Sequence, residues 1–121
     1  MITSVKFVSI PVADQDRALK FYTEKLGFKI VTDQAMGPGR RWIELRIGAQ
    51  LTRIVLFTMD GEEARVGTQM NLSLTCDDVD ATYRQLSQRG VEFEGPPQKQ
   101  PWGSYVIMKD SEGNKMVVGS D

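Results

Sequence analysis

Short runs that alternate apolar and polar residues dominate this chain, and two stretches with helical spacing interrupt them. Alternation over four to eight residues, with many β-branched side chains, is typical of half-buried strands. Ala18, Phe21 and Leu26 have the spacing of one helix face, and Gly27 is suited to end that helix. For the first half of the chain the pattern predicts, in order, strand 5–12, helix 14–26, strand 28–33, strand 41–47 and strand 53–57.

The second half of the chain repeats this order after a polar connection at about 59–69. A shift of 64 residues places Asp14 on Asp78. Each aspartate precedes a helical stretch, and its carboxylate can accept hydrogen bonds from the free N–H groups of the first helical turn. We expect residues 94–103 to form a long loop that three prolines stiffen. The predicted elements of this half are strand 70–76, a helix from 79 that Gly90 ends, strand 91–93, strand 105–109 and strand 115–118.

Each half is therefore a βαβββ module of about 60 residues, with one apolar sheet face covered by one helix. One such module cannot bury both faces of its sheet. We expect one α+β domain over 1–121, in which two modules, about 1–58 and 70–121, curl their mixed sheets around a shared cleft.

Composition narrows the classes of partner. The 121 residues carry a net charge of −1 from well-mixed signs, so attraction to nucleic acid is not expected, and Arg40 and Arg41 are interpreted as a solvated turn. The single cysteine, Cys76, permits no internal disulfide and is interpreted as a small buried hydrophobe. No apolar stretch approaches the roughly 20 residues of a membrane span, so we expect a cytoplasmic protein without a membrane partner.

Three segments in sequence order resemble the vicinal oxygen chelate superfamily. They are IPVADQDRALKFYTEKLGF at 10–28, PWG at 101–103 and DSEGNK at 110–115. That superfamily includes glyoxalase I, extradiol dioxygenases, fosfomycin-resistance enzymes and the bleomycin-binding resistance proteins. The resemblance covers nearly the whole chain and implies the paired-module fold and a homodimer, although one fold of this kind hosts many reactions.

The resemblance also identifies where metal-dependent members carry their ligands. Two of these positions fall on first strands, at Phe7 and Asn71, and two on later strands, at Glu44 and Val117. Only Glu44 is a competent ligand for a divalent metal, and the chain contains no histidine. A transition-metal site needs about three good protein ligands, so we expect no metal and no other cofactor. The metal-dependent chemistries of the superfamily are then not expected.

Because the ligand positions of such members face the cleft, strand alternation identifies the residues that should line it. We expect an apolar floor with a few polar groups, which is the usual form of a small-molecule site. The candidate ligand-binding residues are Phe7, Ser9, Trp42, Glu44, Arg46, Asn71, Ser73, Trp102, Tyr105 and Val117.

Five of these residues also have a purely structural interpretation. Phe7 and Trp42 can simply fill the core, and Trp102 can anchor its loop. Asn71 can satisfy buried backbone groups. Glu44 can pair with a nearby arginine, since a buried carboxylate without a partner is costly.

Three functions remain open. The favoured hypothesis is binding or sequestration of an aromatic or amphipathic small molecule by a metal-free protein, with a homodimer completing the pocket. The alternative is a glyoxalase-like lyase or isomerase, either metal-independent with Glu44 as general base or with an atypical metal site. In the metal-independent form Arg41 or Arg46 would hold an anion. Without histidine the serines and Cys76 lack the usual activator, which favours binding over turnover. The third hypothesis is an interaction module with an empty cleft.

Overall fold

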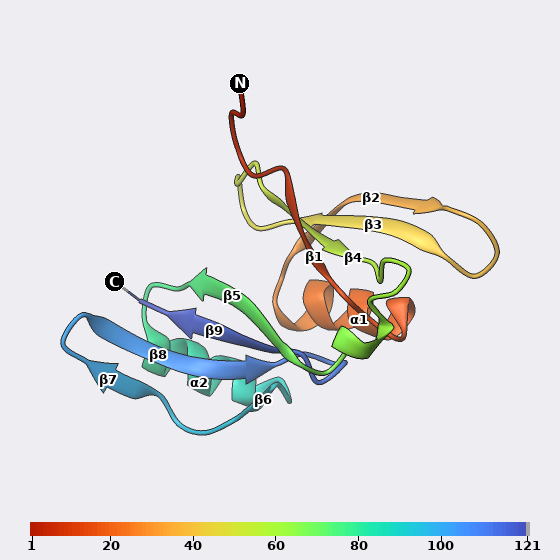
Figure 1. Cartoon of the computed structure of the whole chain (residues 1–121). Coiled ribbons are helices and arrows are strands. Elements are labelled where there is room, and N and C mark those ends of the chain that lie inside the picture. Colours follow the sequence, from red (N-terminus) through yellow and green to blue (C-terminus); the bar gives the residue numbers. More distant parts are fainter. Residues whose placement is uncertain (121) are drawn as a thin grey trace. The chain divides into compact units, whose positions relative to one another are not determined.

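The computed structural model describes residues 1–120 and separates into two compact units, Met1–Val66 and Gly67–Asp121 (Figure 1). We call them the N-terminal unit and the C-terminal unit and describe each by itself. The N-terminal unit contains β1 (Phe7–Ile10), α1 (Gln15–Lys20), the π-helical turn η1 (Phe21–Lys25), β2 (Lys29–Ala35), β3 (Arg41–Arg46), β4 (Arg53–Leu56) and the 3-10 turn η2 (Glu63–Arg65).

The four strands of the N-terminal unit form one sheet in the order β1-β4-β3-β2. β1 pairs with β4 in parallel, and the other pairs are antiparallel. Ala18, Phe21 and Tyr22 are buried on α1 and η1. The strands bury the alternating set Ile10, Ile43, Leu45, Ile54 and Leu56, and these two sets form the core of the unit.

The other face of this sheet carries the residues that alternate with the buried ones along each strand. Ser9 and Glu44 are both register partners of Val55, so the three side chains point to the same side. Because neighbouring residues of one strand alternate between faces, their strand mates at i±2 join them. We call this surface the open face of the N-terminal unit, and it comprises Phe7, Ser9, Trp42, Glu44, Val55 and, just beyond β4, Phe57.

The C-terminal unit forms a five-stranded sheet in the order β5-β9-β8-β6, with β7 also paired to β8. α2 and the buried face of the sheet share a core that includes Val79, Val106, Met108, Met116 and Val118. Its elements are β5 (Gln69–Thr75), α2 (Val79–Gln88), β6 (Glu92–Phe93), β7 (Gln98–Gln100), β8 (Gly103–Lys109) and β9 (Lys115–Gly119).

The predicted α+β class and the helix starts are confirmed. The Asp14 carboxylate accepts a hydrogen bond from Arg17 N at 3.0 Å, and the Asp78 carboxylate accepts one from Ala81 N at 3.0 Å. These are N-cap bonds, which satisfy N–H groups that have no partner inside the helix. No helix among residues 1–120 is long and apolar enough to cross a membrane.

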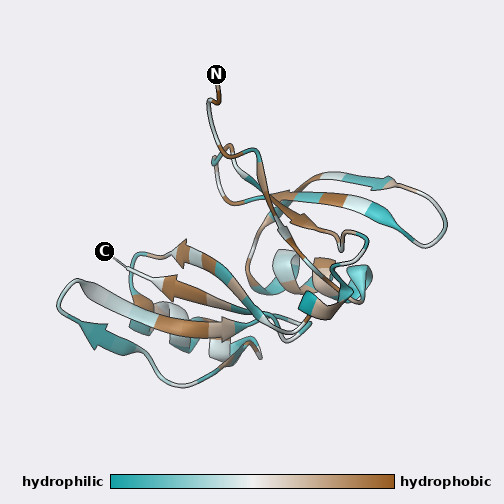
Figure 2. Ribbon diagram, in the orientation of Figure 1, coloured by the Kyte–Doolittle hydropathy of each residue, from teal (hydrophilic) through white to brown (hydrophobic). Residues whose placement is uncertain are grey.

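One predicted element is confirmed with a change of helix type, and one is wrong. The helix expected over 14–26 changes at Phe21 into a π-helical turn, in which Leu26 N donates to the carbonyl of Phe21 instead of continuing the α-helical pattern. The loop expected over 94–103 contains the strand β7. That strand reads Gln-Lys-Gln at a sheet edge, so no apolar alternation marks it, and Figure 2 shows it in teal beside the brown middle of β8.

The DSEGNK motif is a buried turn of the C-terminal unit. Asp110 Oδ1 accepts from the backbone N–H groups of Glu112 at 2.8 Å and of Asn114 at 2.9 Å. The Asn114 amide donates to Asp110 Oδ2 at 2.9 Å, and its oxygen accepts from Gly67 N at 2.7 Å. Asn114 is fully buried, so this network ties the β8–β9 turn to the segment that leads into β5.

Candidate functional site

An aromatic cluster covers the open face of the N-terminal unit. The Phe7 and Trp42 rings meet edge to face, with centroids 5.4 Å apart and planes at 83°. The centroids of Trp42 and Phe57 lie 5.2 Å apart. Val55 is completely shielded from solvent on this same face, so the surrounding side chains close over it. Phe7 and Trp42 remain half-buried, which leaves apolar ring surface available to a ligand.

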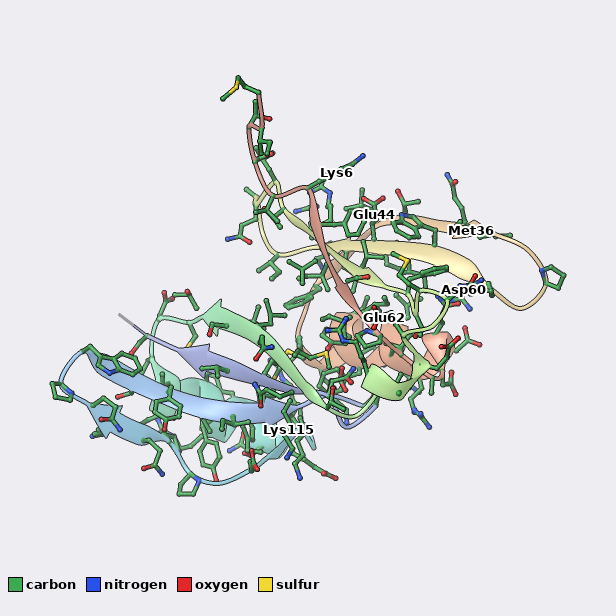
Figure 3. All side chains as sticks on the ribbon, viewed as in Figure 1. Lys6, Met36, Glu44, Asp60, Glu62 and Lys115 are labelled. Atoms are coloured by element: carbon green, nitrogen blue, oxygen red, sulfur yellow. The ribbon has the colours of Figure 1, made fainter. Side chains whose placement is uncertain are left out.

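Glu44 lies on β3, two residues after Trp42 and on the same face of the sheet (Figure 3 labels Glu44). Its Oε2 accepts a hydrogen bond from the Trp42 indole Nε1 at 2.8 Å. The interpretation that Glu44 pairs with an arginine is wrong, because its partner among the described residues is Trp42. Arg46 is exposed and donates instead to the carbonyl of Gly48. Within residues 1–120, Oε1 of Glu44 makes no hydrogen bond or ion pair. The indole therefore fixes the carboxylate and leaves one oxygen able to accept from a ligand.

A cavity of about 150 Å³ opens beside this cluster, entirely within the N-terminal unit. Ser9 Oγ is shielded from solvent and has no hydrogen-bond partner in the described part of the chain. The residues that line the cavity are Phe7, Ser9, Pro11, Phe57, Met59, Glu62 and Arg65. Phe57 was not among the predicted site residues, although its parity with Val55 along the strand could have identified it.

The remaining candidate residues lie in the C-terminal unit. Ser73 and Val117 are register partners on the side of its sheet that also carries Ile107. Tyr105 shares this side by alternation along β8. Trp102 sits in the turn between β7 and β8, 64% exposed, with its ring nearly parallel to Tyr105 at 6.0 Å between centroids. These two rings form an exposed aromatic pair.

Asn71 departs from strand alternation. Its φ of 52° lies in the left-handed region, and the pairing of β5 with β9 shifts register between Gln69 and Ser73. The bulge re-aims the side chain, so the alternation that predicted the direction of Asn71 does not apply there. Asparagine tolerates this backbone conformation better than most residues, at some cost in strain.

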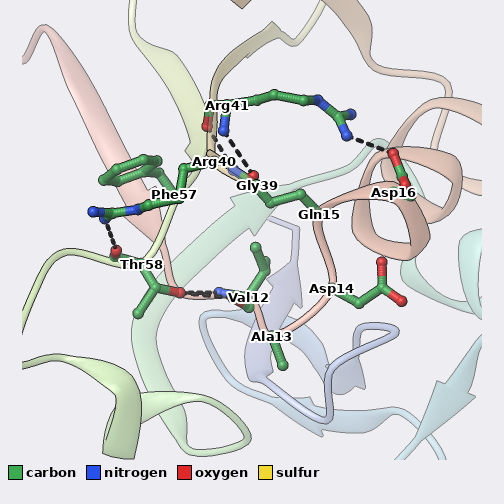
Figure 4. Close-up of a pocket in the computed structure, with 10 residues that line it drawn as sticks. All are labelled: Val12, Ala13, Asp14, Gln15, Asp16, Gly39, Arg40, Arg41, Phe57 and Thr58. Carbon is green, nitrogen blue, oxygen red and sulfur yellow. Dashed lines mark hydrogen bonds and ion pairs between the residues drawn. The ribbon is translucent and has the colours of Figure 1, made fainter. Parts of the chain in front are cut away.

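A second and larger hollow, of about 390 Å³, lies where α1 begins and β3 starts (Figure 4). Gln15 bridges β3 and β4 there. Its Nε2 donates to the carbonyl oxygen of Arg41 at 2.6 Å and to that of Leu56 at 2.9 Å. Its Oε1 accepts from Arg41 N at 3.0 Å. The Arg41 guanidinium binds both Asp16 and Asp33, and these hydrogen bonds raise the pKa of Arg41 above its ordinary value.

The interpretation of Arg40 and Arg41 as a solvated turn is therefore wrong. The Arg40 guanidinium lies over the Phe57 ring at 4.6 Å from the centroid and donates to the carbonyl of Thr58 at 3.0 Å. The partners of Arg41 are 25 and 8 residues away in sequence, a separation at which charge patterning gives no signal. The polar groups around this hollow bond to one another. We call the hydrogen bonds and ion pairs of Gln15 and Arg41 the clamp between α1 and the sheet.

The four positions at which the resemblance implies metal ligands do not fit a metal here. Phe7 and Val117 present hydrocarbon, Asn71 an amide and Glu44 a single carboxylate, whereas zinc requires about three nitrogen, sulfur or carboxylate donors. Among residues 1–120 there is no group of three or more His, Cys, Asp or Glu side chains that could hold a metal ion.

Comparison with known proteins agrees with this fold. The family model described as Glyoxalase/Bleomycin resistance protein/Dioxygenase superfamily matches residues 4–118. The uncharacterized protein YetH of Bacillus subtilis (strain 168) is 39% identical over 123 residues, which cover 98% of each chain.

Two solved structures share this fold over almost their whole length. One is a member of the same superfamily from Sphaerobacter thermophilus DSM 20745, with 32% identity, a TM-score of 0.88 and coverage of 99% of this chain and 98% of that one. The other is TnmS3, an antibiotic binding protein from Streptomyces sp. CB03234, with 32% identity, a TM-score of 0.83 and coverage of 98% and 96%. The chain belongs to the glyoxalase/bleomycin resistance protein/dioxygenase superfamily.

Proposed function

We propose that this protein binds an aromatic or amphipathic small molecule on the open face of its N-terminal unit and holds it without chemical change. The observation that carries the proposal is the Trp42–Glu44 hydrogen bond inside the Phe7–Trp42–Phe57 cluster. Half-buried rings supply contact area, and one oriented carboxylate oxygen supplies direction. An apolar surface with a few fixed polar groups is the usual form of a small-molecule site.

The similar protein TnmS3 is described as an antibiotic binding protein, which supports the same class of function for this chain. The free oxygen of Glu44 favours a ligand that carries a hydrogen-bond donor or a positive charge next to its aromatic part. A donor placed there would make a charge-assisted hydrogen bond, which is stronger than a neutral one.

We include the C-terminal aromatic pair in the proposal. Trp102 exposes most of its side chain, and its ring lies nearly parallel to that of Tyr105. A flat ligand can stack on such a ring with little loss of side-chain freedom.

We further propose that the protein is a homodimer. Exposed apolar side chains such as Ile30, Met36 and Leu51 support this proposal.

The alternative function, a metal-independent lyase or isomerase, rests on the same oxygen. Glu44 Oε1 has no partner within the described residues, so it can accept a proton from a bound substrate as well as a hydrogen bond. Glu44→Gln separates the two functions. In a binding protein it weakens the ligand complex and leaves the ligand intact in both variants. In an enzyme it abolishes turnover while the affinity stays nearly unchanged.

The test uses a panel of aromatic antibiotics and the fluorescence of Trp42. In a Trp102→Phe background, which keeps an aromatic ring beside Tyr105, Trp42 is the remaining tryptophan of the chain, so quenching reports the open face. We expect at least one compound to quench with a stoichiometry of one per chain and to be recovered unchanged by mass spectrometry. Glu44→Gln should weaken that compound about 10-fold, from the loss of one charge-assisted hydrogen bond. Glu24→Gln, at an exposed η1 position with the same change of charge, is the matched control.

A further inference from the structure

The cavity beside Ser9 is the right size for one small ring. Its volume of about 150 Å³ is that of cavities known to bind benzene in proteins. Phe7 and Phe57 line it with rings, and Pro11 and Met59 add hydrocarbon. Glu62 and Arg65 complete the lining, and their charged groups approach to 3.8 Å (Figure 3 labels Glu62). An apolar ring that enters this cavity would therefore meet mostly apolar walls.

One polar atom in these walls lacks a partner. Ser9 Oγ is shielded from solvent and bonds to nothing within residues 1–120. Ser9 lies beside the fully buried Val55 in register, so a hydrocarbon side chain would suit this position for folding alone. A buried hydroxyl without a partner destabilises the free protein, whereas the same hydroxyl strengthens a complex in which a ligand completes its hydrogen bond.

From these observations we propose that the Ser9 cavity is a subsite for a single aromatic ring that carries a neutral polar substituent, such as a phenolic hydroxyl. The proposal rests on the proposed function and adds the chemistry of one part of the ligand. A hydroxyl of this kind can both donate to and accept from Ser9 Oγ. A neutral substituent suits the hydroxyl of Ser9 best, because Glu62 and Arg65 already pair with each other in the cavity wall and an ion placed at Ser9 would meet no opposite charge there.

The position of the subsite also limits the size of the ligand. Ser9 on β1 and Glu44 on β3 flank Val55 on β4 and point to the same side. Two strand spacings separate them, which is about 10 Å. A ligand with a ring in the Ser9 cavity thus needs a second part of comparable length to place a donor at Glu44. The molecule that fills both points has two polar ends and an apolar middle.

The test compares phenol with toluene, which have nearly the same shape and differ in that a methyl group replaces the hydroxyl. Binding to the full-length protein is measured by NMR titration, together with the thermal unfolding of each variant. We expect the wild-type protein to prefer phenol, and Ser9→Ala to weaken phenol about 2- to 10-fold while toluene binding stays the same. The free Ser9→Ala protein should melt at a higher temperature than the wild type, because the variant removes a buried hydroxyl that has no partner.

Ser4→Ala is the matched control, since Ser4 is an exposed serine of the same unit that precedes β1 and is not among the candidate ligand-binding residues. It should change neither phenol binding nor the melting temperature. The subsite proposal is overturned if Ser9→Ala weakens phenol and toluene equally, or if it lowers the melting temperature, which would indicate a bonded hydroxyl or a structural water. It is also overturned if neither compound binds while the antibiotic panel still quenches Trp42. If neither compound binds and the panel does not quench Trp42, both the subsite and the proposed function fail.

Discussion

Replacing Gln15 by alanine should destabilise the N-terminal unit far more than its place at the start of a six-residue helix suggests. Its side chain makes three hydrogen bonds, to Arg41 O, Leu56 O and Arg41 N, at 2.6, 2.9 and 3.0 Å. They join α1 to the start of β3 and the end of β4. Gln15→Ala removes all three bonds and leaves three backbone groups to find water.

The magnitude follows from the burial of those groups. An intramolecular hydrogen bond contributes about 1 kcal/mol to stability, and a buried group left without a partner costs more. Leu56 is fully buried and Arg41 only half-buried, so water can partly replace the bonds to Arg41. We expect a loss of about 2–3 kcal/mol in the free energy of unfolding. For a chain of this size that corresponds to a Tm lower by about 6–12 °C.

Urea denaturation followed by circular dichroism measures this loss, and the denaturant slope should stay unchanged if only stability falls. Gln85→Ala on the exposed side of α2 is the control and should shift stability by less than about 0.5 kcal/mol. Gln15→Glu keeps the size of the side chain but cannot donate to two carbonyl oxygens, so it should be at least as destabilising as alanine. A loss below about 0.5 kcal/mol in Gln15→Ala would refute the clamp between α1 and the sheet.

Three further substitutions test other parts of the structure. Asn114→Ala removes the buried amide that accepts from Gly67 N and should cost about 2–4 kcal/mol in chemical denaturation; a loss under 1 kcal/mol would contradict a structural turn. Asn71→Gly should stabilise the chain by up to about 1 kcal/mol and Asn71→Ala should destabilise it by a similar amount, since φ is 52°; equal effects would argue against strain. Trp42→Phe keeps an aromatic ring but removes the indole N–H that bonds to Glu44, so ligand affinity should fall about 10-fold with little change in ligand stoichiometry. Isothermal titration calorimetry, which needs no tryptophan fluorescence, measures the affinity. An unchanged affinity would show that the indole N–H does not orient the carboxylate.

Much of the fold could be predicted because its determinants are local. Alternation marked most of the strands, and the carboxylates of Asp14 and Asp78 marked both helix starts, since an N-cap acts within one turn. β7 could not be found in this way. It consists of three polar residues, and it exists because β8 offers backbone partners along its edge, which is a tertiary contact.

The candidate site divides along the same line. Phe7, Ser9, Trp42 and Glu44 lie on one face, as alternation predicted, because β1 and β3 are regular strands. Alternation did not indicate that Glu44 bonds to the Trp42 indole instead of an arginine. That bond depends on the side-chain conformations of Trp42 and Glu44, which lie two residues apart on β3. A bulge in β5 likewise has no pattern of its own, so the direction of Asn71 could not be predicted.

A native mass spectrum of the untagged protein, recorded after incubation with the antibiotic panel, tests small-molecule capture most directly. An affinity tag rich in histidine would import metal and is therefore left out. We predict one organic adduct per chain, present in the wild type and strongly reduced in Glu44→Gln, with the adduct mass equal to that of the intact compound. One stoichiometric metal ion per chain, or an adduct whose mass has changed by reaction, would contradict capture and indicate an enzyme instead.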